Sequence, residues 1–91
     1  MLSKTIQKAF DTQIKNELES AYLYLAMSSY CIGENFIGFS KWLRMQAQEE
    51  LGHGMKLFDY VHSRGGQATL QEIEKPYAEF KNILEVFKIV L

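Results

Sequence analysis

The distribution of helix-breaking residues is the strongest constraint on the fold of this chain. Pro76 is the only proline among 91 residues, and a proline inside a helix removes a hydrogen bond and clashes with the preceding turn. Its position divides the sequence into a long segment that favours helices and a short tail. Since 47% of the residues are hydrophobic and 13% are aromatic, the chain also has much apolar surface to bury.

Two long amphipathic stretches precede Pro76, with apolar residues at the steps of three and four that mark one face of a helix. They predict helices over residues 4–32 and 36–64, each about 43 Å long at 1.5 Å per residue. Ser3 is a suitable N-cap, Gly33 suits the left-handed position after the first helix, and Asn35 can cap the second. The two stripes are Ile6, Phe10, Ile14, Ala21, Tyr24, Leu25, Ser28 and Ile32, and then Phe39, Leu43, Ala47, Gly54, Leu57, Tyr60 and Val61.

The short turn between these helices predicts an antiparallel hairpin. A connector over residues 65–81 follows, which is long for a compact domain, and helical spacing then resumes over about residues 82–91. A hairpin alone covers only part of its apolar stripes. We therefore expect an all-α chain that forms half of a four-helix bundle, completed by a second chain or by a missing C-terminal half.

A second apolar row lies opposite the main stripe of the first helix, formed by Leu23, Met27 and Tyr30. Scattered hydrophobic residues are normal on a protein surface. The alternative is a subunit interface on the outer face of the hairpin, which would fit a chain that needs partners.

Composition excludes several classes of partner and location. The net charge is −1, from 10 basic and 11 acidic residues, so no polybasic patch for nucleic acid or anionic lipid is expected. The first ten residues have no apolar run typical of a signal peptide or a membrane span. Cys31 is the only cysteine, which excludes a disulfide within the chain and fits a reducing cytoplasm. We read this thiol as a small buried hydrophobe.

Three ionisable residues interrupt the apolar stripes near the middle of each predicted helix. Glu17 lies on the first stripe, and Glu50 and His53 lie on the second. A lone carboxylate in an apolar bundle is costly unless it is neutralised or finds a partner. The i, i+3 spacing of Glu50 and His53 places a carboxylate and an imidazole side by side, and this donor pair suits iron, manganese or zinc.

The hairpin geometry brings these three residues together. Glu17 lies about 17 residues before the turn at residue 34 and Glu50 about 16 after it, so the two reach the same height along the helices. A Glu-x-x-His pair is common by chance, and a metal-free hydrogen-bonded network is the alternative interpretation. Glu49 is either a solvated acid or an accessory metal ligand. Tyr24 can hydrogen-bond a ligand carboxylate, donate an electron, or only fill space.

The stretches "NELESAYLYLAMSSYC", "GFSKWLRMQAQEELGHGMKLFDYVHSRGG" and "EIEKP" resemble the first half of a prokaryotic non-haem ferritin, over essentially the whole chain. The resemblance implies a four-helix bundle with a long crossover after its second helix, of which residues 65–81 would be the start. It further implies a 24-subunit iron-storage shell and a di-iron centre that oxidises Fe(II) with O₂ or peroxide. A di-iron peroxidase or oxygenase would share the ligands and differ in substrate.

The resemblance also implies roles for single residues. Glu17, Glu50 and His53 match the ligands of one iron, with Glu50 bridging to a second. Tyr24 matches a tyrosine beside the centre, and Glu49 matches a residue of a third iron site. No haem is expected, because Leu51 stands where a bacterioferritin has its haem-ligating methionine. A rubrerythrin would need a cysteine-rich module.

The remaining ligands of such a centre would come from helices that follow residue 91. We expect either that the chain is a truncated ferritin or that two copies pair as hairpins about a two-fold axis. The pair would supply two copies each of Glu17, Glu50 and His53, which is the four-Glu, two-His set of di-iron bundles. In both cases we expect the chain to associate, because its apolar stripes would otherwise face water.

Overall fold

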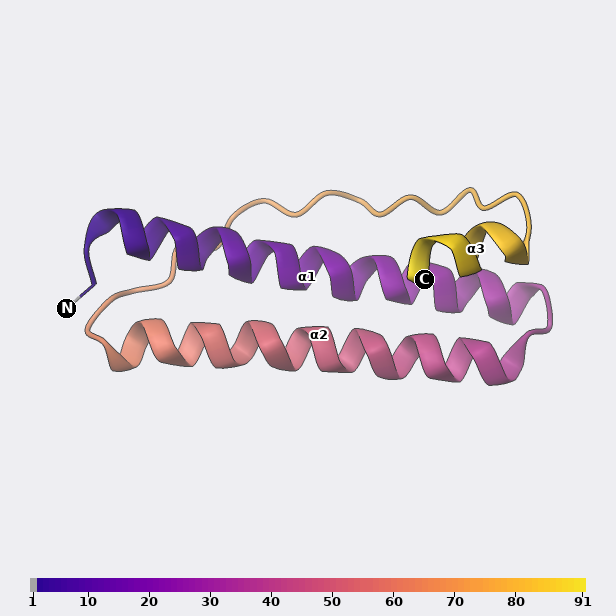
Figure 1. Cartoon of the computed structure of the whole chain (residues 1–91), viewed down its shortest axis with the longest axis horizontal. Helices are drawn as coiled ribbons and strands as arrows, with labels where there is room; N and C mark the ends of the chain where they lie inside the picture. The colour runs from indigo at the N-terminus through magenta and orange to yellow at the C-terminus, as the bar shows by residue number, and fades with distance from the viewer. Residues whose placement is uncertain (1) are drawn as a thin grey trace.

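The computed structural model describes residues 2–91 and is an elongated helical hairpin with extents of 49 × 19 × 19 Å. Helix α1 spans Lys4–Gly33, α2 spans Ile37–Ser63 and α3 spans Ile83–Val90. No strand occurs within residues 2–91. The first two helices run antiparallel, and the chain then returns along α1 to place α3 near the hairpin turn (Figure 1). The all-α hairpin expected from the sequence is confirmed.

The helices end through side-chain and backbone caps that the sequence encodes locally. The Ser3 hydroxyl accepts a hydrogen bond from the backbone N–H of Ile6 at 3.2 Å and so caps α1. Each long helix ends in a Schellman motif, which contains a residue with positive φ. The backbone N–H of that residue and the N–H of the residue after it donate hydrogen bonds to carbonyls in the last turn of the helix. Gly65 has this role after α2, with φ 78°.

The left-handed residue after α1 is Asn35, with φ 65°, and not the predicted Gly33. Gly33 remains in the last turn of α1, and asparagine is among the few non-glycine residues that adopt positive φ without a large steric penalty. The sequence analysis predicted that Asn35 caps α2, and this prediction is wrong. The position before α2 is occupied by Phe36, whose side chain makes no capping hydrogen bond.

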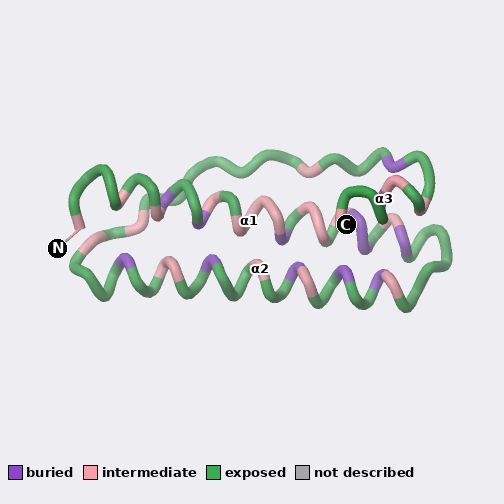
Figure 2. Tube along the Cα trace, viewed as in Figure 1, coloured by how far each residue is buried: buried purple, intermediate pink, exposed green. Residues whose placement is uncertain are grey.

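Small residues at the interface allow α1 and α2 to approach closely. The buried interface residues of α1 include Ala21 and Ser28, and those of α2 include Ser40, Ala47 and Gly54, and Figure 2 shows the buried positions of α2 facing α1. The hydroxyls of Ser28 and Ser40 lie 2.8 Å apart, and each also donates toward the partner's backbone carbonyl at 2.9 Å. This pairing fixes the relative register of the helices.

The connector follows the outer side of α1, in the direction expected for the predicted crossover. Asp11 on α1 accepts a hydrogen bond from the backbone N–H of Thr69 at 3.1 Å. About two helical turns further on, the Glu19 carboxylate accepts one from the backbone N–H of Glu74 at 3.2 Å. The connector thus reaches the turn end of the hairpin as an ordered strap, as Figure 1 shows.

The row formed by Leu23, Met27 and Tyr30 is covered by the chain's own C-terminal segment. Met27 is 1% exposed, and the Tyr30 ring packs edge-on against the ring of Phe80 at a centroid distance of 5.3 Å. This corrects both interpretations of the row, as scattered surface residues or as a subunit interface. The row belongs to a hydrophobic cluster that the C-terminal segment completes. Its buried members are Met27, Cys31, Leu43, Phe80 and Val86, and the partly buried residues packed against them are Leu23, Tyr24, Tyr30, Phe39, Ile83 and Val90.

Cys31 is fully buried in this cluster, and burial raises the pKa of its thiol. It is therefore a small core residue, as predicted. The aromatic rings of Phe39 on α2 and Phe87 on α3 stack at a centroid distance of 4.5 Å. Because Phe39 belongs to α2, the short third helix packs across both long helices.

Much of the predicted apolar stripe remains exposed. Leu25, Ile32 and Tyr60 are 47%, 59% and 40% exposed, although they belong to the periodic pattern. Two helices bury only the strip along their line of contact, and the flanks of each stripe have no cover in a single chain. Within the described residues, no helix combines the length and the low polarity needed to cross a membrane.

The packing of α3 on α1 predicts the outcome of a core truncation. Met27→Ala should lower the free energy of unfolding by about 2 to 5 kcal/mol, because it leaves a cavity beneath α3. Leu84→Ala, at a position that is 57% exposed, is the control and should change it by no more than about 0.5 kcal/mol. Chemical denaturation at two protein concentrations measures both. A Met27→Ala effect that appears only where the protein is associated would indicate that this row is a subunit interface instead.

Candidate metal centre

Glu17, Glu50 and His53 form a cluster at mid-height between the two long helices. Glu17 projects from α1, and the other two project from one face of α2. One ligand atom of each residue lies within 4.8 Å of those of the other two. These are the three residues that the sequence brings to one height. Within residues 2–91, no fourth histidine, cysteine or acidic side chain joins this group.

His53 lies close to both carboxylates without forming a hydrogen bond to either. His53 Nδ1 lies 3.7 Å from Glu17 Oε2 and 3.7 Å from Glu50 Oε2, which is beyond hydrogen-bond range. Two donors bound about 2.1 Å from a cation at a tetrahedral angle would lie roughly 3.4 Å apart. The donor set and its spacing therefore fit a divalent cation with little movement of the side chains.

Burial differs sharply across the cluster. The Glu17 and Glu50 side chains are 17% and 24% exposed, whereas the His53 side chain is 55% exposed. The carboxylates are thus held between the helices, and the imidazole stands at the edge of the groove. A cation bound here would be shielded on the helix side and open on the other.

The carboxyl groups of Glu17 and Glu50 perturb each other's titration. The neighbouring Glu50 carboxyl lowers the pKa of Glu17, and the neighbouring Glu17 carboxyl raises the pKa of Glu50. Burial and the negative charge of Glu17 raise the pKa of Glu50 further. A divalent cation between the two groups would offset the repulsion between the ionised carboxylates.

Two further residues support Glu17, and neither was identified from the sequence. Gln13 donates a hydrogen bond from its Nε2 to Glu17 Oε1 at 3.0 Å. Gly54 on α2 faces the stem of Glu17, since a Cβ at Gly54 would lie 3.6 Å from the Cβ of Glu17. The sequence signal for Gln13 was its position one helical turn before Glu17, where side chains four residues apart meet.

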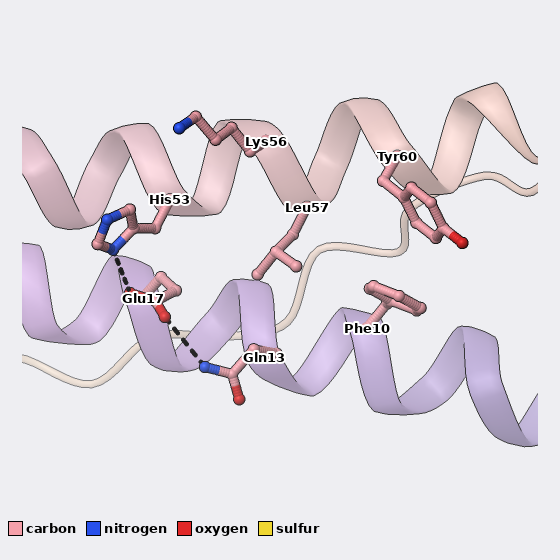
Figure 3. Close-up of a pocket in the computed structure, with 7 residues that line it drawn as sticks. All are labelled: Phe10, Gln13, Glu17, His53, Lys56, Leu57 and Tyr60. Carbon is pink, nitrogen blue, oxygen red and sulfur yellow. Dashed lines mark hydrogen bonds and ion pairs between the residues drawn. The ribbon is translucent and has the colours of Figure 1, made fainter.

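An open pocket of about 500 Å³ leads from the cluster toward the N-terminal end of α1 (Figure 3). Its walls are mainly apolar and aromatic, and the labelled Glu17 and His53 lie at one end of it. Small polar species can therefore reach the cluster from this side. The lining residues are Phe10, Gln13, Glu17, His53, Lys56, Leu57 and Tyr60.

Tyr24 and Glu49 lie apart from the three clustered residues. Tyr24 is half-buried and lines a smaller groove beside the end of α3, together with Met27 and Val90. Glu49 is exposed on α2 and is not among the clustered donors. The structure thus brings together Glu17, Glu50 and His53, and places the other two predicted site residues at the periphery.

Comparison with known proteins identifies a consistent set of relatives. Residues 7–91 match the family described as the ferritin-like domain. A bacterial non-heme ferritin from Staphylococcus epidermidis is 43% identical over 88 residues, which cover 97% of this chain and 53% of the relative. A solved open-pore ferritin from Archaeoglobus fulgidus is 44% identical with a TM-score of 0.94, and the match covers 99% of this chain and 56% of that one.

A third relative, the ferritin of Chlorobium tepidum, is 37% identical with a TM-score of 0.92 over 98% of this chain and 55% of that chain. The chain therefore spans about half the length of the relatives that it matches. Because the likeness extends over nearly the whole chain at this level of identity, it concerns both the fold and the sequence.

The raised pKa of Glu50 predicts that the metal-free protein is stabilised by Glu50→Gln at neutral pH. A raised pKa means that the folded protein holds the Glu50 proton more tightly than the unfolded chain does. That contribution is complete below the ordinary glutamate pKa and is lost as the pH rises through the raised pKa of the folded state. Glutamine does not ionise and can still donate to Glu17, so its advantage should grow between about pH 4 and pH 7.

Thermal melts in a chelating buffer measure this difference. Glu49→Gln, at the exposed neighbouring position, is the matched control and should not reproduce the pH-dependent gain. Equal melting temperatures for the wild type and Glu50→Gln at pH 7 would show that the two carboxylates do not repel each other in the folded chain.

Proposed function

Because this chain belongs to the ferritin-like domain family, we propose that it takes part in iron storage and detoxification by binding Fe(II) at Glu17, Glu50 and His53. Fe(II) is the substrate, and O₂ or peroxide is the oxidant. The observation that carries the proposal is the geometry of the cluster, with two carboxylates and one imidazole whose donor atoms lie within 4.8 Å. We also propose a cytoplasmic location, because the single cysteine, Cys31, is buried and unpaired, which fits a reducing compartment.

Each residue has a distinct role in this proposal. Glu17 is a terminal carboxylate ligand, and His53 is a terminal nitrogen ligand at the exposed edge. Glu50 is assigned as the bridging ligand between two irons, by its match to the ferritin family. Carboxylates suit this chemistry because they stabilise the rise in charge when Fe(II) is oxidised to Fe(III). Zinc or manganese would be bound by the same donors.

Tyr24 and Glu49 have peripheral roles in the proposal. Tyr24 lies on the same side of α1 as Glu17, two turns away, and is assigned as a hydrogen-bond donor or one-electron source beside the centre. Glu49 is assigned as an accessory metal ligand, by its match to a residue of the third iron site of ferritins. Both residues lie away from the clustered donors, so each assigned role would begin only when iron is bound at the cluster.

Two other functions share parts of this site. A metal-free assembly module would use the three side chains as a hydrogen-bonded network, but the 3.7 Å separations of His53 Nδ1 from both carboxylates are too long for one. A di-iron peroxidase or oxygenase would use the same ligands. The preferred oxidant and the formation of ferric mineral distinguish that activity from storage.

The second half of the ligand set must come from outside the described residues. A second copy of the chain would supply another Glu17, Glu50 and His53, as a dimer of hairpins around a two-fold axis. A following segment that completes the bundle would supply it within one subunit. Either arrangement covers the exposed apolar flanks of α1 and α2, and both lead to a homo-oligomer, with the 24-subunit shell as the larger form.

Iron binding predicts a clear effect of removing the bridging carboxylate. Under anaerobic conditions, Fe(II) should raise the melting temperature of the wild type, because a ligand that binds only the folded state stabilises it. Glu50→Ala should weaken Fe(II) binding by at least about tenfold, as expected for a direct ligand, and should lose this rise. Glu72→Ala, at an exposed position of the connector, is the control. Equal Fe(II) affinity in wild type and Glu50→Ala would contradict the site.

Association predicts a relation between oligomer size and metal content measured on one sample. Light scattering should show a dimer or a larger assembly at micromolar concentrations, and the assembled fraction should carry the bound iron. The physical reason is that the exposed flanks of both helices and the missing ligands are supplied by the same neighbour. A well-folded monomer at high dilution that retains full iron content would contradict this expectation.

A further inference from the structure

We propose that Gln13 is a positioning residue that commits Glu17 to bind the metal through a single oxygen, Oε2. The inference rests on the proposed iron site and adds to it a residue that touches neither iron nor oxidant. Its basis is the contact between the Gln13 amide and the Glu17 carboxylate, and what that contact leaves free. Figure 3 shows the chain of contacts from Gln13 through Glu17 to His53.

The two oxygens of Glu17 are in different environments. Oε1 accepts the hydrogen bond from Gln13 Nε2 at 3.0 Å, whereas Oε2 lies 3.7 Å from Nδ1 of His53. An ionised carboxylate only accepts hydrogen bonds, so the nitrogen end of the Gln13 amide is the end that can face it. One oxygen is therefore occupied by a donor, and the other is directed at the space between the clustered ligands.

The stem of Glu17 is restricted from the opposite side. Gly54 of α2 is buried directly against it, and a Cβ at Gly54 would already be in van der Waals contact with the Cβ of Glu17 at 3.6 Å. The backbone of α2 thus limits how far the Glu17 side chain can swing toward α2. The stem of Glu17 thus lies against α2, and its carboxylate is held by the Gln13 amide.

A neutral donor suits this position better than a charged one. A lysine or arginine beside Glu17 would bring a second cation close to the metal and would compete with it for the carboxylate. Lys56 lines the same pocket, yet among residues 2–91 only His53 lies within ion-pair distance of Glu17. Hydrogen-bonded partners of metal ligands typically change metal affinity by about 10- to 100-fold when they are removed.

The test replaces the Gln13 donor and measures binding of Co(II), used alone as a spectroscopic probe under argon. Gln13→Met keeps the length of the side chain and removes the donor. It should weaken Co(II) binding about 10- to 100-fold and change the visible absorption bands, because Glu17 can then chelate through both oxygens. The apo melting temperature should stay close to that of the wild type, since Gln13 is exposed. Gln48→Met, in a different groove beside Leu51, is the matched control.

Two further variants make the outcomes distinguishable. Gln13→Lys restores a donor of similar length, so it should recover the wild-type band shape while binding more weakly because of its charge. Gln13→Met with wild-type affinity and bands, or Gln13→Lys with the bands of Gln13→Met, would overturn the positioning role. Glu17→Ala should abolish tight Co(II) binding. If Glu17→Ala still binds Co(II) tightly, the proposed metal site itself is wrong. If Glu17→Ala loses Co(II) binding while Gln13→Met binds like the wild type, only the positioning role of Gln13 is wrong.

Discussion

The register of the hairpin is the constraint on which the rest of this structure depends. It is set where α1 and α2 approach through small side chains, with the Ser28 and Ser40 hydroxyls 2.8 Å apart near the turn and Gly54 against the stem of Glu17 further along. The helix contact is close at both levels, so a shift by one turn would be opposed by larger side chains. The same register brings Glu17 close to Glu50, and the proposed metal centre depends on it.

That arrangement concentrates an electrostatic cost at the middle of an otherwise apolar contact. The carboxyl groups of Glu17 and Glu50 lie close together, and their interaction lowers the pKa of Glu17 and raises the pKa of Glu50. Packing near the turn offsets the cost, because α3 and Phe80 bury Met27 and Cys31. The end of the hairpin far from the turn is not covered by α3, and an open pocket there leads to His53. Stability is thus provided at one end of the hairpin and access to the site at the other.

The sequence predicted the features that depend on local chemistry or on helical spacing. The Ser3 cap follows from its residue type, and the extents of the two long helices and the meeting of Glu17 with Glu50 follow from periodicity and from the position of the turn. Features that depend on which segment covers which face were missed. Periodicity placed Met27 on the outer face of the hairpin, because it does not show which face a later segment of the chain covers. Asn35 took the left-handed position expected for Gly33 because either residue type can adopt it. Gln13 was overlooked because a polar residue at the edge of a stripe reads as solvated surface.

We propose that Glu17, Glu50 and His53, whose donor atoms already lie close together, form a cation site. Anomalous X-ray scattering from a crystal of the protein soaked with Fe(II) without oxygen tests this proposal. We expect a peak between the two carboxylates, within bonding distance of His53 Nδ1 and of Oε2 of Glu17. Ordered iron bound elsewhere on the chain, with no peak between the carboxylates, would contradict it.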